Sequence, residues 1–281
     1  MTATLLDGRL VSDLLLKGVS HKVSALKKKK IAPKLVIIIV GDNPASLSYI
    51  RQKSNAAQKT GIVCEVKNLP EKTTTKNLVS LIEKLNKDNK THGILVQLPL
   101  PPKIETPLVI RAVDPKKDVD GFNAYNLGKM FLSKEFEKLA PCTPSGIIKL
   151  LEHYKISVAG KNVTIVGRSN IVGKPLAVML INRDATVTVC HSKTRNLTDY
   201  TKRADILVAA VGRPNFIKAA MVKTGAIVID VGVNKVDGKL VGDVDFKAVA
   251  KKASFISPVP GGIGPMTVAC LMENVIKTFN I

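Results

Sequence analysis

Tyr49 and Lys53 are four positions apart, so a helix would place the phenol and the amine on one face. Ser46 falls on the same stripe. An exposed lysine stays protonated, near its reference pKa of about 10.4. A lysine held against a tyrosine, away from water or beside another cation, can lose its proton near neutral pH and act as a base. Read alone, the pair is also typical of an ordinary surface helix, so its neighbours must decide.

An amide lies near the end of an apolar run that could supply such a neighbour. Gln97 stands between Val96 and Leu98 in GILVQLPLPP, residues 93–102. A polar side chain near the end of a buried strand must find a partner or a ligand, although local backbone can satisfy it.

Two carboxylates and a glycine-rich loop are further candidates. Asp118 and Asp120 lie in DPKKDVDGFN, residues 114–123, and could be simple turn formers. The sequence SPVPGGIGPMT, residues 257–267, could likewise be no more than a tight connection.

The helix that would carry Tyr49 and Lys53 has clear end signals. In DNPASLSYIRQKSNAAQKTGI, residues 42–62, Asn43 can cap the helix, Pro44 fits its first turn and Gly61 can end it.

A second candidate site follows a later apolar run. KNVTIVGRSNIVGKPLAVML, residues 161–180, reads as strand, turn and helix, the beginning of a dinucleotide-binding unit. Its pattern, Gly167-x-Ser169-x-x-x-Gly173, is one residue longer than the usual fingerprint and has serine in place of the second glycine. A ligand-free tight turn is the alternative interpretation.

The next strand indicates which dinucleotide would bind. NAD-binding units place an acidic residue there to hold the ribose 2′-hydroxyl. TVTVCHSKTR, residues 186–195, has no carboxylate, but Ser192 can donate a hydrogen bond and Arg168 can reach the same corner. A serine beside a guanidinium suits a 2′-phosphate, so the sequence favours NADP over NAD. The alternative is that these are simply exposed polar residues in a loop.

The order of the apolar segments predicts an α/β fold with parallel sheets covered by helices. Continuous aliphatic runs, typical of strands buried on both faces, lie at residues 35–40, 93–98, 163–166, 186–190, 206–210 and 226–230. Helical stretches lie between them, for example at 75–86 and 172–182. TPSGIIKLLEHY, residues 143–154, predicts another helix with Thr143 as N-cap and Pro144 at the first position.

The length of 281 residues favours two domains, and a polar, proline-punctuated stretch at 132–146 predicts the hinge between them. We expect an N-terminal α/β substrate domain over residues 1–138 and a Rossmann-like domain over 139–266. A closing helix over 267–281 is expected to pack back onto the first domain.

Composition limits the classes of partner. The net charge of +21 attracts anionic ligands. Aromatic residues are 4%, tryptophan is absent, and basic residues are spread along the chain, which argues against nucleic acid. The basic run at 27–30 is interpreted as the solvated end of a helix. Scattered cysteines and histidines predict no metal. No secretory signal is visible and the longest aliphatic run has six residues, so we expect a cytoplasmic protein without a membrane segment.

Together these motifs resemble a known family. YIRQK, VQLPLP, DVDG, GRSNIVGKP, CHSKT and PVPGGIGPMT are similar, in order and over essentially the whole chain, to the methylenetetrahydrofolate dehydrogenase/methenyltetrahydrofolate cyclohydrolase family in its compact bacterial form. The resemblance implies oxidation of 5,10-methylenetetrahydrofolate by NADP, then hydrolysis of the methenyl product to 10-formyltetrahydrofolate, in a cleft between the domains. It also implies a homodimer and a place in one-carbon metabolism that serves purine biosynthesis.

The resemblance also implies roles for individual residues. Lys53 would be the key catalytic residue, supported by Tyr49 and Gln97, and Asp120 would bind the pterin. The residues implied to contact the folate substrate are Ser46, Tyr49, Lys53, Val96, Gln97, Leu98, Asp120, Pro260, Gly261, Gly262, Ile263 and Gly264. Those implied to contact NADP are Gly167, Arg168, Ser169, Ser192 and Val233.

Three rival interpretations stay open on sequence alone. One is another two-domain NADP enzyme, such as a relative of shikimate dehydrogenase, and a second is a basic nucleic-acid-binding protein. In the third, only one of the two folate activities is retained.

Overall fold

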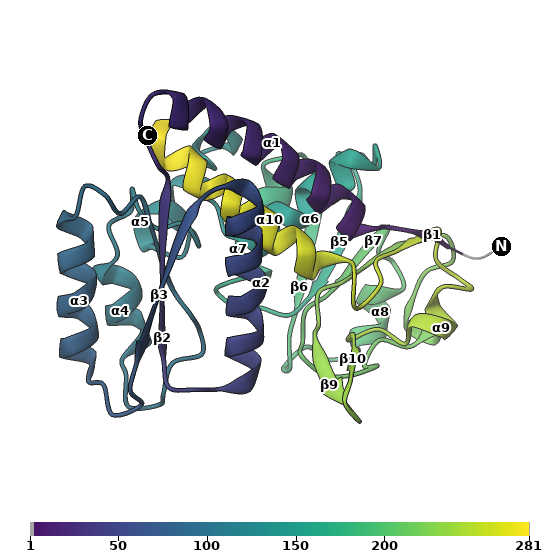
Figure 1. The fold of residues 1–281 in the computed structure, drawn as a ribbon. Helices are drawn as coiled ribbons and strands as arrows, with labels where there is room; N and C mark the ends of the chain where they lie inside the picture. The colour runs from purple at the N-terminus through teal and green to yellow at the C-terminus, as the bar shows by residue number, and fades with distance from the viewer. Residues whose placement is uncertain (1–2, 281) are drawn as a thin grey trace. The chain divides into compact units, whose positions relative to one another are not determined.

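The computed structural model describes residues 3–280. It divides into two compact units. The six-stranded unit comprises Met1–Ser12, Met130–Phe136 and Thr143–Thr267, and the three-stranded unit comprises Asp13–Lys129, Glu137–Cys142 and Val268–Ile281. Each unit has its own parallel sheet, as the alternation of apolar runs and helices predicts (Figure 1).

The three-stranded unit is built on a sheet of order β3-β2-β4. Its strands are β2 (Lys34–Val40), β3 (Val63–Leu69) and β4 (Gly93–Val96). Its helices are α2 (Pro44–Thr60), α3 (Thr75–Lys87), α4 (Thr106–Ala112) and α5 (Ala124–Met130), together with most of α1 (Gly8–Lys28) and of α10 (Ile263–Lys277).

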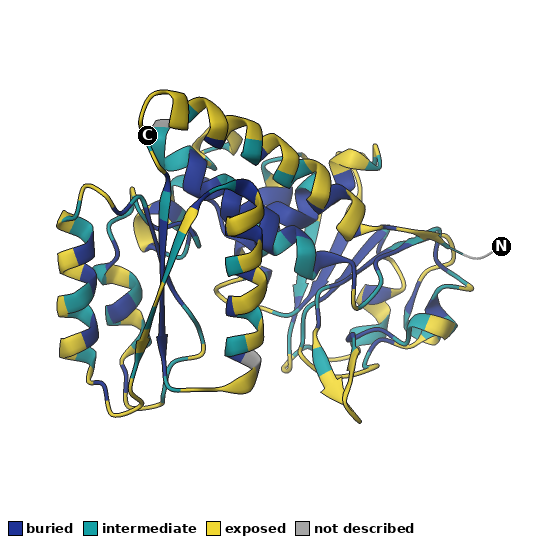
Figure 2. Cartoon of the chain, in the orientation of Figure 1, coloured by how far each residue is buried: buried dark blue, intermediate teal, exposed yellow. Residues whose placement is uncertain are grey.

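The central strand β2 explains how both faces of this sheet are covered. Its successive side chains point to opposite faces, and all six residues from Leu35 to Val40 are buried. Leu35, Ile37 and Ile39 pack with residues of α1, α2 and α10, whereas Val36, Ile38 and Val40 pack with α3 and α4. In Figure 2 this strand is dark blue after its first residue. A continuous aliphatic run is therefore the sequence of a strand that has helices on both sides.

The six-stranded unit has the order β1-β11-β8-β7-β5-β6, with every neighbouring pair parallel. Its strands are β1 (Thr4–Leu5), β5 (Asn162–Val166), β6 (Thr186–Cys190), β7 (Ile206–Ala209), β8 (Ile227–Asp230) and β11 (Phe255–Ile256), with a separate antiparallel pair β9 (Asn234–Val236) and β10 (Lys239–Val241). Its helices are α6 (Cys142–His153), α7 (Gly173–Ile181), α8 (Leu197–Thr201) and α9 (Phe246–Val249).

The first strands of the six-stranded sheet create a switch point. The chain runs from β5 to β6 on one side, and then returns to β7 on the other side of β5. In open parallel sheets, ligands bind outside the carboxyl ends of the strands at such a point.

Several expected elements differ in detail from the structure. Thr143 lies inside α6 rather than capping it, and its hydroxyl lies 3.0 Å from that of Thr267. β4 ends at Val96, two residues before the expected end. The expected basic helix end is found, because α1 ends at Lys28 and residues 27–30 are exposed.

The N-terminus joins the six-stranded unit. Thr4 and Leu5 pair with Phe255 and Ile256 of β11, so residues 3–12 pack with this unit rather than with residues 13–129. Residues 268–280 pack with the three-stranded unit. None of the helices described is both long and apolar enough to cross a membrane.

Candidate functional site

Helix α2 carries Tyr49 and Lys53 and is bounded as the sequence predicts. Asn43 Oδ1 accepts a hydrogen bond from the backbone N–H of Ser46 at 3.2 Å, which satisfies a donor that the helix leaves free. Gly61 follows the helix with a φ of +78°, a left-handed conformation that glycine adopts without strain. These end residues set where α2 begins and ends.

Lys53 is buried and has a defined partner. Its side chain is 8% exposed, and Nζ donates a hydrogen bond to Gln97 Oε1 at 3.0 Å. Gln97 Nε2 in turn donates to the backbone carbonyl of Leu98 at 2.6 Å. The amide therefore has both ends engaged and presents its oxygen, not its nitrogen, to the lysine.

Tyr49 and Ser46 lie on the same helix, one turn and two turns before Lys53. Ser46 is buried, and Tyr49 is half-buried. Burial raises the pKa of the Tyr49 phenol above its ordinary value, so this hydroxyl stays protonated at neutral pH. The tyrosine can donate a hydrogen bond or offer an apolar ring face, but it is not a base there.

Asp120 lies within the electrostatic reach of Lys53. Burial of its carboxyl raises the pKa to about 6, the charge of Lys53 opposes that rise, and Asp118 adds to it. Asp120 is therefore a carboxyl group that changes charge close to physiological pH.

Asp118 has a structural role beside it. Its carboxylate accepts hydrogen bonds from the backbone N–H groups of Gly121 at 3.1 Å and Asn123 at 2.7 Å, and from Asn126 Nδ2 at 3.1 Å. This pattern closes the turn that carries Asp120. The sequence allowed Asp118 to be either a site residue or a turn former, and in the structure it forms the turn.

A small pocket opens at the ends of β4 and of this turn. Its lining joins aliphatic side chains to the two carboxyl groups, and consists of Ile94, Val96, Leu98, Ile110, Val113, Asp118, Asp120 and Phe122. The structure thus brings Val96, Leu98 and Asp120 to one pocket, while Lys53 and Gln97 are hydrogen-bonded to each other in the same unit.

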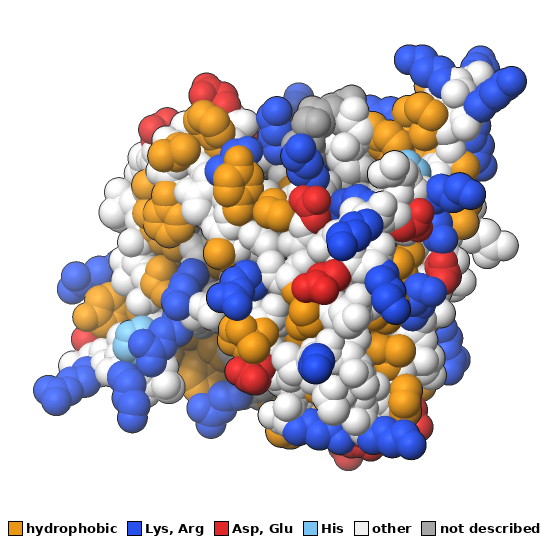
Figure 3. All heavy atoms as spheres, turned by 90° about the vertical axis from the view of Figure 1, so that its left-hand side faces the viewer, with side chains coloured by type: hydrophobic (Ala, Val, Ile, Leu, Met, Phe, Trp, Pro, Cys, Tyr) orange, Lys and Arg blue, Asp and Glu red, His pale blue; other side chains and the backbone are white. Residues whose placement is uncertain are grey.

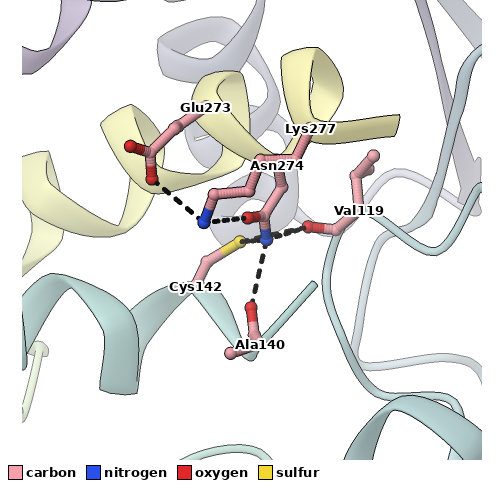
Figure 4. A network of polar contacts seen from close by, with 6 residues as sticks. All are labelled: Val119, Ala140, Cys142, Glu273, Asn274 and Lys277. Carbon is pink, nitrogen blue, oxygen red and sulfur yellow. Dashed lines mark hydrogen bonds and ion pairs between the residues drawn. The ribbon is translucent and has the colours of Figure 1, made fainter. Parts of the chain in front are cut away.

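A residue of the C-terminal helix α10, Asn274, also holds the turn that carries Asp120. This residue was not identified from the sequence. Asn274 of α10 is 1% exposed, and its Nδ2 donates to the carbonyls of Val119 at 2.9 Å and Ala140 at 3.0 Å (Figure 4). The Cys142 thiol donates to the same Val119 carbonyl at 3.3 Å. An asparagine within the apolar run of α10 was the available signal, because a buried amide needs partners.

We expect Asn274→Leu to lower the free energy of unfolding by about 2–4 kcal/mol, since it removes the amide donor from the Ala140 carbonyl and leaves the Val119 carbonyl with only the weak thiol donor of Cys142. Chemical denaturation measures the change. Asn77→Leu on the exposed face of α3 is the matched control and should stay within about 0.5 kcal/mol of the unaltered protein. Equal midpoints for the two variants would contradict this role.

The glycine-rich loop at residues 260–264 belongs to the six-stranded unit, whereas Lys53, Gln97 and Asp120 belong to the three-stranded unit. The N-terminal segment packs tightly against this loop. A Cβ on Gly8 would lie 1.8 Å from the carbonyl oxygen of Gly262, and the Arg9 backbone N–H donates to the Gly261 carbonyl at 3.1 Å. The absence of a side chain at Gly8 is therefore needed for this packing.

The predicted dinucleotide residues all follow strands at the carboxyl edge of the six-stranded sheet. Gly167, Arg168 and Ser169 come after β5, Ser192 comes after β6, and Val233 comes after β8. Because these strands are parallel, their carboxyl ends lie at one edge of the sheet. The structure therefore brings the five residues to the edge that contains the switch point.

The turn after β5 needs glycine at two positions. Gly167 has a φ of +133°, and a Cβ there would lie 2.2 Å from the Ala210 carbonyl oxygen. A Cβ on Gly173, at the start of α7, would lie 2.1 Å from the Gly167 carbonyl oxygen. Ser169 Oγ accepts a hydrogen bond from the Val172 N–H at 3.1 Å, so the serine that replaces a fingerprint glycine stabilises the longer turn.

The donors at this edge have the chemistry of a phosphate site. Arg168, Ser192, Lys193 and Arg195 are exposed, and β6 ends without a carboxylate. Guanidinium and hydroxyl groups match a 2′-phosphate, and an acidic residue would repel it. On the face shown in Figure 3, the Lys and Arg side chains are spread out rather than gathered into one patch.

Two family models match the chain in succession. The tetrahydrofolate dehydrogenase/cyclohydrolase catalytic domain matches residues 6–120, and the NAD(P)-binding domain of the same family matches residues 141–281. The bifunctional protein FolD of Nautilia profundicola is 51% identical over 275 residues, which cover 98% of this chain and 96% of the relative.

Solved structures agree with these matches. The bifunctional methylenetetrahydrofolate dehydrogenase/cyclohydrolase of Campylobacter jejuni is 47% identical, with a TM-score of 0.95 and 99% of each chain covered. The Trypanosoma brucei enzyme, solved with NADP and an inhibitor, is 37% identical, with a TM-score of 0.96, and covers 100% of this chain and 98% of its own. Shikimate dehydrogenase of Listeria monocytogenes, at 13% identity and a TM-score of 0.51, shares the fold alone.

These findings confirm the predicted α/β fold class, and the predicted cofactor agrees with the NAD(P)-binding domain. With both domains of one enzyme family matched in order and about half of the residues shared with a bifunctional relative, the chain belongs to the tetrahydrofolate dehydrogenase/cyclohydrolase family.

Proposed function

We propose that Lys53 carries the hydrolytic half of a two-step reaction on folate-bound one-carbon units. In the first step the methylene bridge of 5,10-methylenetetrahydrofolate loses a hydride and becomes the methenyl cation. In the second, water adds to that cation, a proton leaves, and the ring opens to 10-formyltetrahydrofolate. The observation that carries the proposal is a lysine 8% exposed whose amine donates to Gln97 Oε1 at 3.0 Å.

Water addition requires a group that accepts or relays a proton at the reacting carbon, which is general acid–base work. Lys53 assists this transfer, and Gln97 aims the amine, because its own nitrogen is held by the Leu98 carbonyl. The ring of Tyr49 contacts the folate, and Tyr49 also helps to hold Lys53, which lies one turn further along α2. Ser46, on the same face of α2, supports this side of the folate site. Both steps also depend on orientation of the bound substrate.

Asp120 binds the pterin in this proposal. An ionised carboxylate matches the adjacent N–H donors of the 2-amino-4-oxo edge in a two-point, charge-assisted contact. The pocket that contains Val96, Leu98 and Asp120 supports the assignment. Its other carboxylate, Asp118, is already held by donors of its own turn, so an aliphatic wall beside Asp120 suits a flat heterocycle with one polar edge. Residues 260–264 are proposed to contact substrate on the strength of the family motif.

NADP is the proposed hydride acceptor for the first step. The turn at Gly167, Arg168 and Ser169 approaches its phosphates, and Arg168 and Ser192 hold the 2′-phosphate. Support comes from the exposed cations and the missing carboxylate at the end of β6. Val233 borders the cofactor after β8. We assign folate binding to the domain expected at residues 1–138 together with the closing helix expected at 267–281, and cofactor binding to the domain expected at 139–266. Residues 3–12 and 130–136 of the first range pack with the six-stranded unit.

One assay tests both steps. Purified protein is mixed with 5,10-methylenetetrahydrofolate and NADP, and NADPH, the methenyl species and the formyl product are followed together. NADPH and formyl product in matched amounts support the proposal. If NADPH forms while the methenyl species accumulates, the protein has the dehydrogenase activity only. The absence of both products would overturn the proposal.

The raised pKa of Asp120 predicts a pH-dependent affinity. With its pKa raised to about 6 by burial, the carboxyl is mostly neutral at pH 5 and mostly ionised at pH 7, and only the ionised form accepts two N–H donors. The KM for methenyltetrahydrofolate, measured by its hydrolysis without NADP, should be about tenfold higher at pH 5 than at pH 7. Asp120→Asn should have a high KM that no longer depends on pH. A wild-type KM that is flat across this range would contradict the assignment.

We also propose that the protein is a cytoplasmic homodimer, and that its formyl product supplies a formyl donor for purine biosynthesis. Support comes from the family membership and from the chemistry of the product. Light scattering on the purified protein tests the dimer directly.

A further inference from the structure

Asp243 is a buried carboxylate for which the proposed chemistry has no use. Its exposed fraction is 0%, and it lies just after β10 in the six-stranded unit. Within residues 3–280 it forms no ion pair, and its hydrogen-bond donors are three backbone N–H groups and one side-chain amide. Burying a carboxylate without a counter-ion costs free energy unless hydrogen bonds replace those it made with water. The groups that donate hydrogen bonds to Asp243 therefore indicate its role.

Three of those donors are consecutive backbone N–H groups. Val211 and Gly212 donate to Asp243 Oδ2 at 2.6 and 2.9 Å, and Arg213 donates to Oδ1 at 2.9 Å. Successive N–H groups that converge in this way form a concave anion site. The carboxylate of Asp243 occupies that site and fixes the conformation of residues 211–213.

The loop held in this way lies at the switch point of the sheet. Residues 211–213 follow β7, and β7 pairs with β5, whose carboxyl end carries Gly167. The two loops touch, since a Cβ on Gly167 would lie 2.2 Å from the Ala210 carbonyl oxygen. Any shift of residues 210–213 would therefore disturb the turn that approaches the cofactor phosphates.

The fourth donor connects Asp243 to a second cofactor segment. Asn234 Nδ2 donates to Asp243 Oδ1 at 2.9 Å, and Asn234 directly follows Val233, the residue assigned to the cofactor after β8. One carboxylate thus ties the loops that follow two different strands of the sheet.

A second buried carboxylate holds Asp243 itself in place. Asp230, the last residue of β8, accepts the backbone N–H groups of Asp243 and Val244, each at 2.9 Å. Glycines make room for both carboxylates: a Cβ on Gly242 would lie 1.8 Å from Asp230 Oδ2, and one on Gly232 would lie 2.1 Å from the Asp243 carboxyl. The chain of contacts runs from β8 through Asp230 and Asp243 to the loop after β7.

We propose that Asp243 is a positioning residue for the dinucleotide, which fixes the loop at residues 211–213 against the Gly167 turn and so sets the affinity for NADP. It acts through backbone groups and takes no part in hydrolysis. The inference rests on the proposed function, because it assigns NADP to this edge of the sheet.

The test uses the two activities as separate readouts. Asp243→Asn keeps the shape but replaces one accepting oxygen with an NH₂ group that faces N–H donors. We expect the KM and the Kd for NADP to rise about 10- to 100-fold, since charge-assisted hydrogen bonds are lost. Hydrolysis of methenyltetrahydrofolate without NADP should stay within about twofold, because that step involves no dinucleotide.

Two further variants separate positioning from folding. Asp205→Asn is the matched control: its carboxylate accepts the Asn162 backbone N–H at 2.9 Å at the opposite end of β7, so its loss should not change the Kd for NADP. Asn234→Ala removes one donor from Asp243 and should raise the Kd about threefold without abolishing folding.

The outcomes distinguish the possibilities. A raised Kd for NADP with hydrolysis retained, and with Asp205→Asn unchanged, supports the proposal. An unchanged Kd in both Asp243→Asn and Asn234→Ala would overturn it. Parallel loss of hydrolysis and NADP binding in both variants would also overturn it, because Asp243 would then only stabilise the fold. Hydrolysis by the unaltered protein tests the proposed function separately.

Discussion

Lys53→Met is expected to abolish hydrolysis of methenyltetrahydrofolate, with a loss of about 10²- to 10⁴-fold in kcat, the range that general acid–base groups contribute. Methionine fills nearly the same volume as the lysine stem, so the buried position stays packed while the amine and its bond to Gln97 are lost. The initial rate of methenyltetrahydrofolate hydrolysis at saturating substrate, measured without NADP, gives the kcat directly.

The control for this variant lies on the same helix. Lys59→Met removes an exposed lysine of α2 and should leave hydrolysis within about twofold of the unaltered protein. If Lys53→Met hydrolyses the methenyl substrate at a near-normal rate, another group must manage the proton and the assignment is wrong.

Arg168→Ala is expected to raise the KM for NADP about 10- to 100-fold and to leave the KM for NAD almost unchanged. The guanidinium follows β5 and is exposed at the edge that also carries Ser192. Only NADP has the 2′-phosphate with which it would form charge-assisted bonds, so the effect must depend on which dinucleotide is used.

Initial rates of NADPH and NADH formation measure both constants on the same preparation. Arg203→Ala is the matched control, because this exposed arginine precedes β7 and so lies at the amino edge of the same sheet. Equal effects of Arg168→Ala on NADP and NAD would mean that Arg168 binds a part common to both, and Ser192 or Lys193 would then have to recognise the phosphate.

Much of the fold follows from local signals. The run from Leu35 to Val40 predicts a strand buried on both faces, and the structure places it between two layers of helices. Asn43 and Gly61 bound α2 as their conformational preferences predict. The elements that the sequence did not indicate are short or half-exposed, such as β11 with two residues and β3 with its alternating exposure, because a strand of this kind has no continuous apolar run.

The individual chemistry of the site follows partly from the sequence. Spacing on a helix is local, so Ser46, Tyr49 and Lys53 could be placed on one stripe without knowledge of the fold. The partnership of Lys53 with Gln97 joins residues 44 positions apart, and only the family motifs suggested it before the structure gave the distance. The pKa of Asp120, raised to about 6, depends on burial by surrounding chain and could not be obtained from its neighbours in sequence.

By itself, the sequence determined the alternation of strands and helices, the ends of α2 and the family motifs. It also showed that the segment after β6 has basic residues and no carboxylate, as a phosphate site requires. These features depend on backbone preferences, side-chain periodicity and residue type, which act over a few positions. The tertiary structure alone decided that Asn274 holds the Asp120 turn and that Asp243 binds the loop after β7. Those contacts join positions 155 and 32 residues apart, and a buried polar group reveals its role only when its partners are brought to it.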